Sequence, residues 1–551
     1  MATRDAFPVS EGTNVKANAI IHKMQGTIDV MFSFASFLKT KGVAPPVEEG
    51  SLVLKSAIEL AEMIRNKDTS CCNVVRTFIN RIREVNAVLN CVVKEDDRGF
   101  DDAFALATQY DSFLATATPE DIESLREKKP FFGVPLTCKE AFECCGRPNT
   151  SGMKAHKDKI AAKDAPVVAA MKAAGCILIG VTTVPEMCMW WETMSYNHGT
   201  TNNPYDTRRI VGGSSGGEAC TISAGASVIG IGSDIGGSIR MPAFFNGVYG
   251  HKPSPHLVPN EGQFPGHEND DDLLTTGPIC SHVEDLIPMF KIMVGEKAED
   301  LRLDEEVDFN KFTLKVYSVE SIANALGVSP VCNALKSVQK KVEESLKNNQ
   351  GAEIKPTTFP EFDETFFIWS CTLALTGSPS NCERMSTGLN GDINPLKELV
   401  KILCPIPFIR GSKHTVPAVV LCLLEKLNRM SLEEKKKYAA KGEALRQKIV
   451  EILGKDGVLL LPSSPRNAYY HHRPKASPID CIYTMIGNVL QLPITQVPLG
   501  LDTNKLPLGI QVMAGPLNDR LSIAVAGALS KAFGGWTPPM KVEKKVVKAE
   551  A

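Results

Sequence analysis

Nine of the 42 glycines of this chain lie within 33 consecutive residues, "VGGSSGGEACTISAGASVIGIGSDIGGSIRMPA" at positions 211–243, together with six serines. Glycine tolerates backbone conformations that other residues avoid, and it lets the main chain approach a bound molecule without an intervening Cβ. Between the two glycine clusters, "SVIGIGS" (227–233) is apolar enough for a buried strand, and a helix is expected to open at Ile239. A strand, a glycine turn and a helix in this order predict a functional loop carried by a layered α/β fold.

The composition narrows the classes of function. The chain has 551 residues, a net charge of −2, 43% hydrophobic and 23% charged residues, which is typical of a globular protein. Because no broad basic surface is expected, nucleic acid is excluded as a partner, and small molecules or neutral lipids are favoured. The 16 cysteines form no C-x-x-C motif, so the pattern predicts neither a zinc site nor a disulfide framework and fits a reducing compartment.

Short apolar runs alternate with helical patterns from residue 51 to residue 538, as in α/β proteins. No internal repeat or low-complexity linker interrupts this stretch, so one large domain is expected over 51–538. The expected strands lie at 131–139, 176–183, 227–233, 312–318, 457–463, 494–500 and 508–515.

The two ends of the chain are expected to lie outside this domain. Residues 1–50 form a lead-in whose most apolar piece, "VMFSFASFL" (30–38), is well short of the ~20 residues that span a bilayer. A flexible segment or an interfacial helix is therefore expected there, and neither a transmembrane span nor a secretory signal. Residues 539–551 are rich in lysine and are expected to form a flexible tail.

A second apolar segment, "LKELVKILCPIPFIRGSKHTVPAVVLCLLEKL" (396–427), pairs two apolar pieces around a turn with proline and basic residues. One interpretation is a pair of core helices joined by a loop. The other is a helix–turn–helix that lies on a membrane, with Arg410, Lys413 and His414 facing an anionic lipid surface.

Two interpretations of the glycine–serine stretch find little support. A phosphate-binding loop needs G-x-x-x-x-G-K-[ST], or G-x-G-x-x-G after a strand, and neither is present. A nucleophile elbow, G-x-S-x-G, matches residues 212–216, and His471 or His472 could act as its base. However, an elbow follows an apolar strand, whereas "NNPYDTRRIV" (202–211) is polar and charged.

The third interpretation uses both glycine clusters. The backbone N–H groups ahead of the helix would converge on a substrate carbonyl oxygen, with Ser238 as the nucleophile; they belong to Ile235, Gly236, Gly237 and Ser238. A serine nucleophile needs a base, and Lys139, at the end of an apolar run, can serve if burial lowers its pKa. Ser214 would carry the proton between them, and its glycine neighbours would permit an unusual backbone such as a cis peptide.

Three motifs give the chain a resemblance to a known family. "GGSSGGEACTISAGASVIGIGSDIGGSIRMPAFFNGVYGHKPS" (212–254), "GVPLTCKEAF" (133–142) and "LPLGIQVMAG" (506–515) resemble the amidase signature family. The similarity runs from about residue 50 to residue 538. Within that family the chain looks most like the fatty-acid amide hydrolases, above all their second vertebrate type.

The resemblance implies a single α/β amidase-signature domain with a twisted mixed β-sheet covered by helices on both faces. It also implies a base (Lys139), a bridging serine after a cis peptide (Ser214), an acyl-forming nucleophile (Ser238), and an oxyanion hole at 235–238. Cys188 aligns with a position whose backbone contacts substrate. The positions expected to support the site are Ser215, Asp234 and Arg240.

The function that the resemblance implies is hydrolysis of fatty-acid amides, such as N-acyl ethanolamines and primary fatty amides, through an acyl-enzyme and without metal or cofactor. It further implies a protein that is cytoplasmic or associated with an intracellular membrane, with 396–427 as its membrane cap. A homodimer is a separate expectation. Three alternatives stay open: a subunit of a glutamine-dependent amidotransferase, a carboxylesterase and a non-catalytic binding protein.

Overall fold

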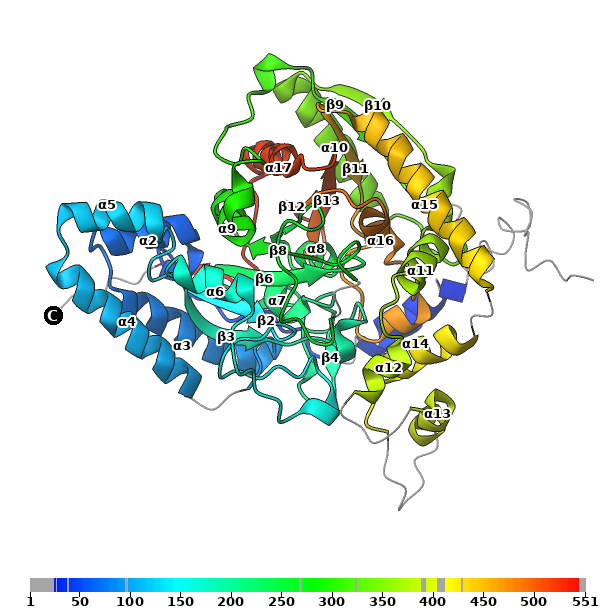
Figure 1. Ribbon diagram of the computed structural model, residues 1–551, viewed down its shortest axis with the longest axis horizontal. Coiled ribbons are helices and arrows are strands. Elements are labelled where there is room, and N and C mark those ends of the chain that lie inside the picture. The colour runs from blue at the N-terminus through cyan, green and yellow to red at the C-terminus, as the bar shows by residue number, and fades with distance from the viewer. Residues whose placement is uncertain are drawn as a thin grey trace, which may run out of the picture.

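The computed structural model describes residues 24–25, 27–36, 39–94, 98–266, 270–322, 325–387, 393–403, 412–427 and 430–544. A ten-stranded mixed sheet forms its centre, in the order β10-β9-β11-β13-β12-β7-β8-β6-β2-β3 (Figure 1). The strands are β2 (Pro135–Lys139), β3 (Ile177–Thr182), β6 (Ile229–Asp234), β7 (Tyr249–Lys252), β8 (Thr275–Cys280), β9 (Lys315–Ser318), β10 (Glu353–Pro356), β11 (Gly457–Leu461), β12 (Ile494–Leu501) and β13 (Pro507–Ala514).

The sheet has two parallel edges and an antiparallel middle. β10, β9 and β11 run parallel at one edge, β6, β2 and β3 at the other, and antiparallel pairs join them through β13, β12, β7 and β8. All seven strands expected from the sequence are present. The sequence analysis missed β7, β8 and β10, because glycine, proline or charged residues interrupt their apolar runs.

Helices pack on both faces of this sheet, as expected. Thr495 of β12 bonds Ser522 of one helix, α17 (2.9 Å). Its neighbour Gln496 pairs with Gln511 of β13, which bonds Arg240 of another helix, α8 (2.6 Å). Because successive strand residues point to opposite faces, α17 and α8 lie on opposite sides of the sheet.

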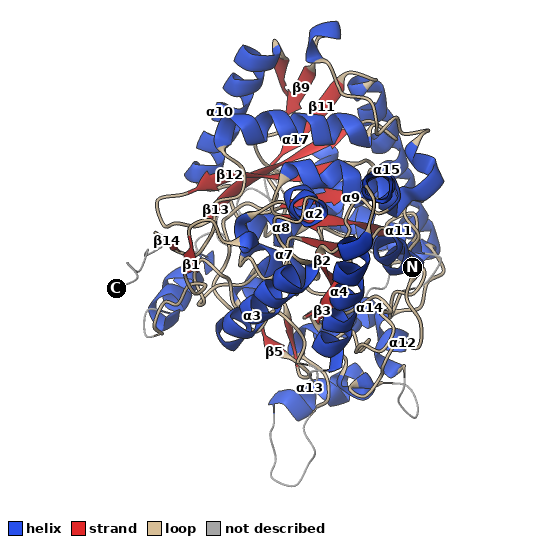
Figure 2. Ribbon diagram, turned by 90° about the vertical axis from the view of Figure 1, so that its left-hand side faces the viewer, coloured by secondary structure: helices blue, strands red, loops and turns tan. Residues whose placement is uncertain are grey.

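The helices surround the sheet in both views (Figures 1 and 2). They are α2 (Ala57–Arg65), α3 (Cys71–Leu89), α4 (Arg98–Thr116), α5 (Pro119–Lys128), α6 (Pro166–Ala173), α7 (Gly216–Ser223), α8 (Arg240–Phe245), α9 (Leu286–Val294), α10 (Asn333–Gln350), α11 (Thr365–Leu375), α12 (Asn381–Ser386), α13 (Pro395–Leu403), α14 (Val416–Leu427), α15 (Leu432–Leu453), α16 (Ile482–Val489) and α17 (Asp519–Phe533).

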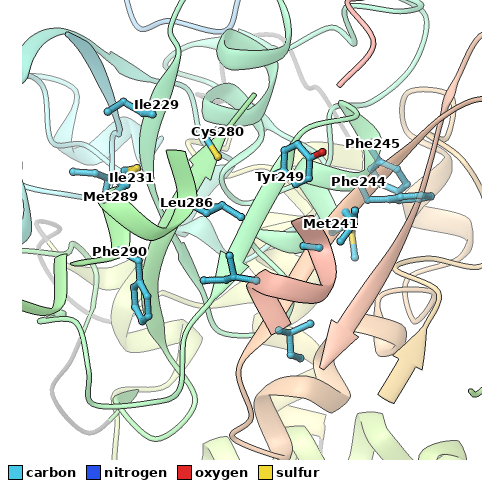
Figure 3. Close-up of a cluster of buried hydrophobic side chains, with 14 of the residues drawn as sticks. Ile229, Ile231, Met241, Phe244, Phe245, Tyr249, Cys280, Leu286, Met289 and Phe290 are labelled. Carbon is cyan, nitrogen blue, oxygen red and sulfur yellow. The ribbon is translucent and has the colours of Figure 1, made fainter. Parts of the chain in front are cut away.

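The core that carries the site lies around β6 and β7. Figure 3 shows side chains of α8 close to Tyr249 of β7, and those of α9 on the side of β6. The labelled side chains are at most 2% exposed and belong to Ile229, Ile231, Met241, Phe244, Phe245, Tyr249, Cys280, Leu286, Met289 and Phe290. This packing fixes the end of β6 and the start of α8, which flank the second glycine cluster.

The two ends of the described chain are joined. β1 (Val47–Glu48) pairs in parallel with β14 (Val542–Glu543), so the expectation of a flexible tail is wrong for residues 542 and 543, which gain backbone partners. Residues 27–36 are helical, and Asp29 bonds Arg473 (2.6 Å). None of the helices in the described ranges is long and apolar enough to cross a bilayer.

The segment 396–427 forms two helices that pack on each other, α13 and α14. The expected turn residue Arg410 lies outside the described residues, and Lys413 is exposed. His414 does not face outward as expected: it is 3% exposed, and its Nδ1 lies 2.7 Å from Glu186 Oε1. The expectation for His414 is wrong because the imidazole has a buried carboxylate partner.

Candidate active site

Lys139 ends β2 in the interior of the molecule, with 1% of its surface exposed. Its Nζ lies 2.8 Å from Ser214 Oγ and 2.9 Å from Ser233 Oγ. Burial lowers the pKa of Lys139, although acidic groups nearby, Asp234 among them, oppose this effect. The structure therefore brings together the expected amine and bridging hydroxyl, in surroundings that favour the neutral amine.

A second buried titratable group bonds side chains of β2, the strand that ends at Lys139, and of β3. Glu218 of α7 accepts a hydrogen bond from Thr182 Oγ1 (2.7 Å) and another from Thr137. Burial raises the pKa of Glu218 to about 8, so this carboxyl is mostly uncharged at neutral pH. A neutral carboxyl does not hold Lys139 in its ammonium form as a carboxylate would.

The backbone at Ser214 has the unusual geometry that its glycine neighbours permit. The peptide bond between Gly213 and Ser214 is cis. A Cβ at Gly213 would collide with the carbonyl oxygen of Trp190, so only glycine fits beside that segment. Gly212 has a φ of +80°, which is also a glycine conformation.

Ser238 lies in the turn between β6 and α8, and Ser215 N donates to its carbonyl oxygen (3.1 Å). Both Ser214 and Ser238 line one cavity with Lys139. Ser215 also joins the two glycine clusters through its Oγ, which lies 3.3 Å from the carbonyl oxygen of Ser233. The two serine-bearing loops are thus fastened to each other beside the lysine.

The expected oxyanion hole is smaller than the sequence analysis predicted. Gly237 N donates to Asp234 Oδ1 (2.7 Å), so this amide is not available to a substrate. Across the described part of the chain, no protein acceptor engages the amides of Ile235, Gly236 or Ser238. A Cβ at Gly237, where φ is +116°, would collide with Thr484, and this contact explains the glycine.

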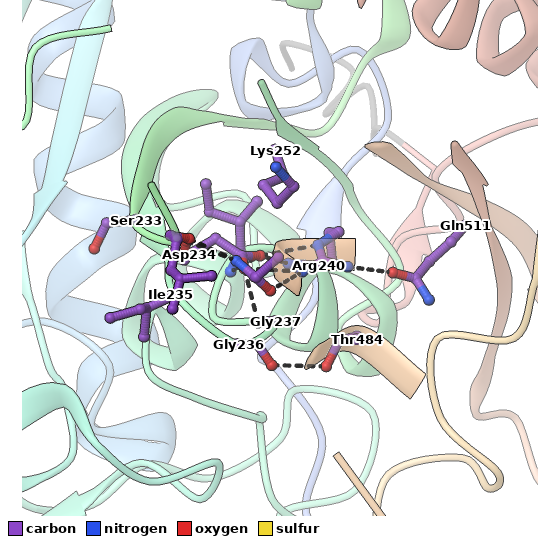
Figure 4. Close-up of polar contacts among 12 residues, drawn as sticks. Ser233, Asp234, Ile235, Gly236, Gly237, Arg240, Lys252, Thr484 and Gln511 are labelled. Atoms are coloured by element: carbon purple, nitrogen blue, oxygen red, sulfur yellow. Dashed lines mark hydrogen bonds and ion pairs between the residues drawn. The ribbon is translucent and has the colours of Figure 1, made fainter. Parts of the chain in front are cut away.

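The two peptide planes ahead of Ser238 are held from their carbonyl side. Trp369 Nε1 donates to the oxygen of Ile235 (2.7 Å), and Thr484 Oγ1 donates to the oxygen of Gly236 (2.9 Å; Figure 4). Because a peptide group is planar, fixing its C=O also fixes the direction of the following N–H. The free amide of Gly236 is thereby preorganised. The free amide of Ser238 is held in the same way, because the carbonyl oxygen of Gly237 accepts from Met241 N (2.8 Å). An oxyanion hole requires such fixed donors.

Asp234 and Arg240 form a fully buried ion pair beneath this turn (2.9 Å; Figure 4). Arg240 also donates to Gln511 (2.6 Å) and Asn488 (2.7 Å). Burial alone would raise the pKa of Asp234, but Arg240 and Asn488 hold it well below its usual range. The pair holds residues 234–240 in place. The sequence analysis listed both residues among those expected to support the site.

Sequence reasoning missed Ser233 as a partner of the lysine. It lies near the carboxyl end of β6, and β6 runs parallel to β2, whose last residue is Lys139. The ends of adjacent parallel strands meet at one edge of a sheet, and ligands bind there. That strand order was the missing signal, since the sequence does not show which strands are neighbours.

The site opens into a small cavity of about 40 Å³. Cys188 lines the wall of this cavity between Met187 and Met189, and the φ of Cys188 is +57°. Burial raises the pKa of the Cys188 thiol, so the thiol stays protonated. The other lining residues, beyond Lys139 and the two serine-bearing loops, are Ala141, Gln263, Phe264, Pro265, Gly266, Asp270, Leu274 and Arg384.

The histidines of the elbow hypothesis have other partners. His471 Nδ1 lies 3.2 Å from Glu192 Oε1, and the backbone N of His472 bonds the same carboxylate (2.9 Å). Neither residue lines the catalytic cavity. Among the described residues, no group of His, Cys, Asp and Glu has the arrangement of a metal site.

The amidase family model matches residues 73–522. The chain belongs to the amidase signature family. It is 45% identical to fatty-acid amide hydrolase 2 of Homo sapiens, over 90% of this chain and 92% of that protein. It is 27% identical to one component of the glutamyl-tRNA(Gln) amidotransferase of Legionella pneumophila, over 86% of this chain and 95% of that component. A solved fatty acid amide hydrolase superposes with a TM-score of 0.69 at 19% identity, covering 97% of this chain and 92% of its own.

As a member of the amidase signature family, the protein is a hydrolase of amide carbon–nitrogen bonds. Its cavity holds a buried amine, a hydroxyl in contact with that amine, a second serine and preorganised amides. These groups are what acyl transfer needs: a base, a nucleophile and donors for the developing oxyanion. The interpretation as a non-catalytic binding protein is correspondingly weaker.

Proposed function

We propose that this amidase hydrolyses fatty-acid amides, N-acyl ethanolamines and primary fatty amides among them, to a fatty acid and an amine. The observation that carries the chemistry is the buried contact between Lys139 Nζ and Ser214 Oγ (2.8 Å) in the cavity that Ser238 also lines. The similarity to fatty-acid amide hydrolase 2, at 45% identity over nine-tenths of the chain, supports the substrate class.

In the first half of the reaction Ser238 Oγ attacks the amide carbonyl carbon. Its proton passes to Ser214 Oγ while the Ser214 proton passes to neutral Lys139 Nζ, which becomes an ammonium. The carbonyl oxygen, now negative, accepts hydrogen bonds from the free amides of Ile235, Gly236 and Ser238. Each such donor contributes about 3–4 kcal/mol to the stability of the transition state.

In the second half the ammonium of Lys139 returns its proton through Ser214 to the leaving nitrogen. The carbon–nitrogen bond then breaks, a neutral amine departs and Ser238 carries the acyl ester. Water attacks this ester by the same proton route and releases the fatty acid. Amines leave poorly unless they are protonated, so a relay that delivers the proton to the departing nitrogen suits an amide substrate.

The cleanest test combines covalent labelling with a substrate panel. We expect a fluorophosphonate to label the wild type and not Ser238→Ala, and Ser254→Ala is the matched control because that buried serine instead bonds Asp519 (2.7 Å). Turnover should be highest for oleamide or N-oleoyl ethanolamine. Full labelling of Ser238→Ala would contradict the nucleophile assignment.

The same panel separates the alternatives. Turnover of glutamine above the lipid amides would favour an amidotransferase component, and fast cleavage of methyl oleate with little cleavage of oleamide would favour a carboxylesterase. The amidotransferase alternative has less support, because the identity to the amidotransferase component is 27%, against 45% for fatty-acid amide hydrolase 2.

Peripheral membrane contact through 396–427 is part of this proposal. The supporting observation is a set of large apolar side chains on α13 and α14 that are 53–66% exposed: Leu396, Val400, Leu424 and Leu427. The helix at 27–36 also exposes apolar side chains, with Val30 at 69% and Phe34 at 67%. A membrane surface would cover these groups and bring the enzyme to substrates that partition into lipid.

We further place the protein inside the cell, in a reducing compartment, because every described cysteine carries a free thiol. Fractionation of cells that express a tagged chain tests this placement and the membrane contact together. Homodimerisation stays a prediction, which light scattering of the purified protein would check.

A further inference from the structure

A buried carboxylate lies in the wall of the catalytic cavity without a role in the proton relay. Asp270 is 1% exposed and lines the cavity together with Arg384 of α12. Its Oδ2 accepts a hydrogen bond from Arg384 Nη2 (2.8 Å), whereas Oδ1 has no partner among the described residues. A buried acceptor without a donor is costly, so this oxygen is a place where a ligand would gain by donating a hydrogen bond.

The carboxylate is held rigidly. Its own carbonyl oxygen accepts from Leu273 N (2.9 Å) and Leu274 N (2.7 Å). The carbonyl oxygen of Leu273 in turn accepts from Asn488 (3.0 Å), which also bonds Asp234 in the clamp beneath the oxyanion hole. The unpartnered oxygen is therefore fixed relative to the catalytic turn.

The contacts also indicate which end of the substrate faces this pair. The segment that contains Gln263 and Pro265 is fastened to the chain just beyond Lys139, through Phe264 N and the carbonyl oxygen of Ala141 (2.8 Å). Arg384 bonds the carbonyl oxygen of Pro265 (2.5 Å) and carries Asp270. This wall is thus continuous with the lysine side of the cavity, where the leaving amine must lie to receive the returning proton.

We propose that Asp270 Oδ1 accepts a hydrogen bond from the amine portion of the substrate, so that the enzyme selects amides whose amine carries a hydroxyl or another donor. This inference rests on the proposed function and deepens it by naming the class of amine: a hydroxyalkyl amine, in preference to a purely alkyl one. Hydrogen bonds to charged groups are about twice as strong as neutral ones, and a purely alkyl amine leaves the carboxylate oxygen unpaired.

The substrates for the test differ at one group. N-oleoyl ethanolamine and N-oleoyl propylamine have the same length, with a hydroxyl in one where the other has a methyl. We expect the wild type to favour the hydroxyl amide by roughly 10- to 100-fold in kcat/KM, the range for a buried charge-assisted hydrogen bond. The same pair with a short phenylbutanoyl chain gives the preference independently of the fatty acyl group.

The variants separate recognition from structure. Asp270→Ala should lower the preference to near 1, mainly through a slower reaction of the hydroxyl amide. Because Arg384 would then lose its partner, the double variant Asp270→Ala/Arg384→Met removes both charges and should show the same loss. The matched control is Asp272→Ala, which removes a carboxylate of the same segment that is 63% exposed and bonds His256; its preference should equal that of the wild type.

The outcomes are distinguishable. A wild type without a hydroxyl preference, or a folded double variant that keeps it, would overturn the assignment of Asp270. If the enzyme cleaves only the two phenylbutanoyl amides and still favours the one with the hydroxyl, the fatty-acyl part of the proposed function is overturned and the role of Asp270 is supported. A wild type that cleaves neither pair would overturn both.

Discussion

The turn that carries Ser238 (residues 234–240) and the hairpin formed by α13 and α14 differ in how they are held in place. Beneath the turn, Asp234, Arg240 and Asn488 are buried, and they bond one another across distant parts of the chain. The hairpin instead exposes apolar side chains, and its base is tied to the body where Glu186 bonds His414 (2.7 Å) and Thr415 N (2.6 Å). Buried polar contacts thus hold the turn, whereas the hairpin leaves part of its apolar surface exposed.

The turn and the hairpin are connected by one short segment of the chain, residues 186–188. Glu186 is followed directly by Met187 and Cys188, which line the catalytic cavity and have φ values of +59° and +57°. A non-glycine residue in this conformation is strained and persists only where its surroundings hold it. The contact at the base of the hairpin is therefore also a support for the wall of the cavity.

The largest effect on activity is expected from substitutions of Lys139. Lys139→Ala should lower kcat by roughly 10³- to 10⁴-fold, comparable to the loss of a member of a catalytic triad. Lys139→Arg should be as inactive, since a guanidinium cannot lose its proton. In the wild type activity should rise with pH through the lowered pKa of Lys139, whereas residual activity of the alanine variant should rise steeply at high pH with hydroxide. An unchanged pH profile would argue against a lysine base.

A large loss of stability is expected when the buried ion pair of Asp234 and Arg240 is broken. Asp234→Asn leaves Arg240 buried with its charge uncompensated, which costs about 3–5 kcal/mol and should appear as a lower midpoint of denaturant unfolding. Because the pKa of Asp234 is lowered in the folded state, its contribution is complete above about pH 4 and is lost as the pH falls toward the folded value. The difference between wild type and variant should therefore shrink in acid; a constant difference would contradict the ion-pair account.

An intermediate effect is expected where the two regions meet. Glu186→Gln weakens the buried contact with His414 and should lower kcat/KM for N-oleoyl ethanolamine by roughly 10-fold, the range for a buried hydrogen-bonded group. Labelling by a small fluorophosphonate should change much less, because the nucleophile is untouched. The exposed pair of His256 and Asp272 gives the control, since Asp272→Asn should leave both readouts unchanged. An equal loss in labelling and in turnover would show instead that the substitution disturbs Ser238 and its partners directly.

The smallest effect on the chemistry is expected from the outer face of the hairpin. Leu424→Asp/Leu427→Asp should weaken cosedimentation with anionic lipid vesicles several-fold and leave turnover of a short soluble amide unchanged. Val88→Asp, on α3, is the control at an exposed apolar position outside the hairpin. Vesicle binding that survives the double variant and fails in the control would place the membrane contact elsewhere.

The sequence predicted the centre far better than the hairpin, for physical reasons. Lys139, Ser214 and Ser238 lie in dense local motifs whose residue types leave few alternatives, and the buried strands beside them are continuous apolar runs. The sequence did not show that Asp234 accepts a hydrogen bond from Gly237 N. An Asp at this position was expected to support the turn, and not to compete with the substrate for that amide. The burial of His414 depends on Glu186, 228 residues away, and no local pattern shows such a contact.

The order of strands also has a consequence for how the chain is made. The two parallel edges of the sheet come from residues 135–234 and 315–461, and they are joined through β12 and β13, at 494–514. Until these late strands leave the ribosome, β7 and β11 each present an open edge, which is a hazard for aggregation. Thr484, Asn488 and Gln511, which hold the catalytic turn, emerge at the same stage. During synthesis the proposed nucleophile, Ser238, thus comes first, and the residues that hold its turn in place come last.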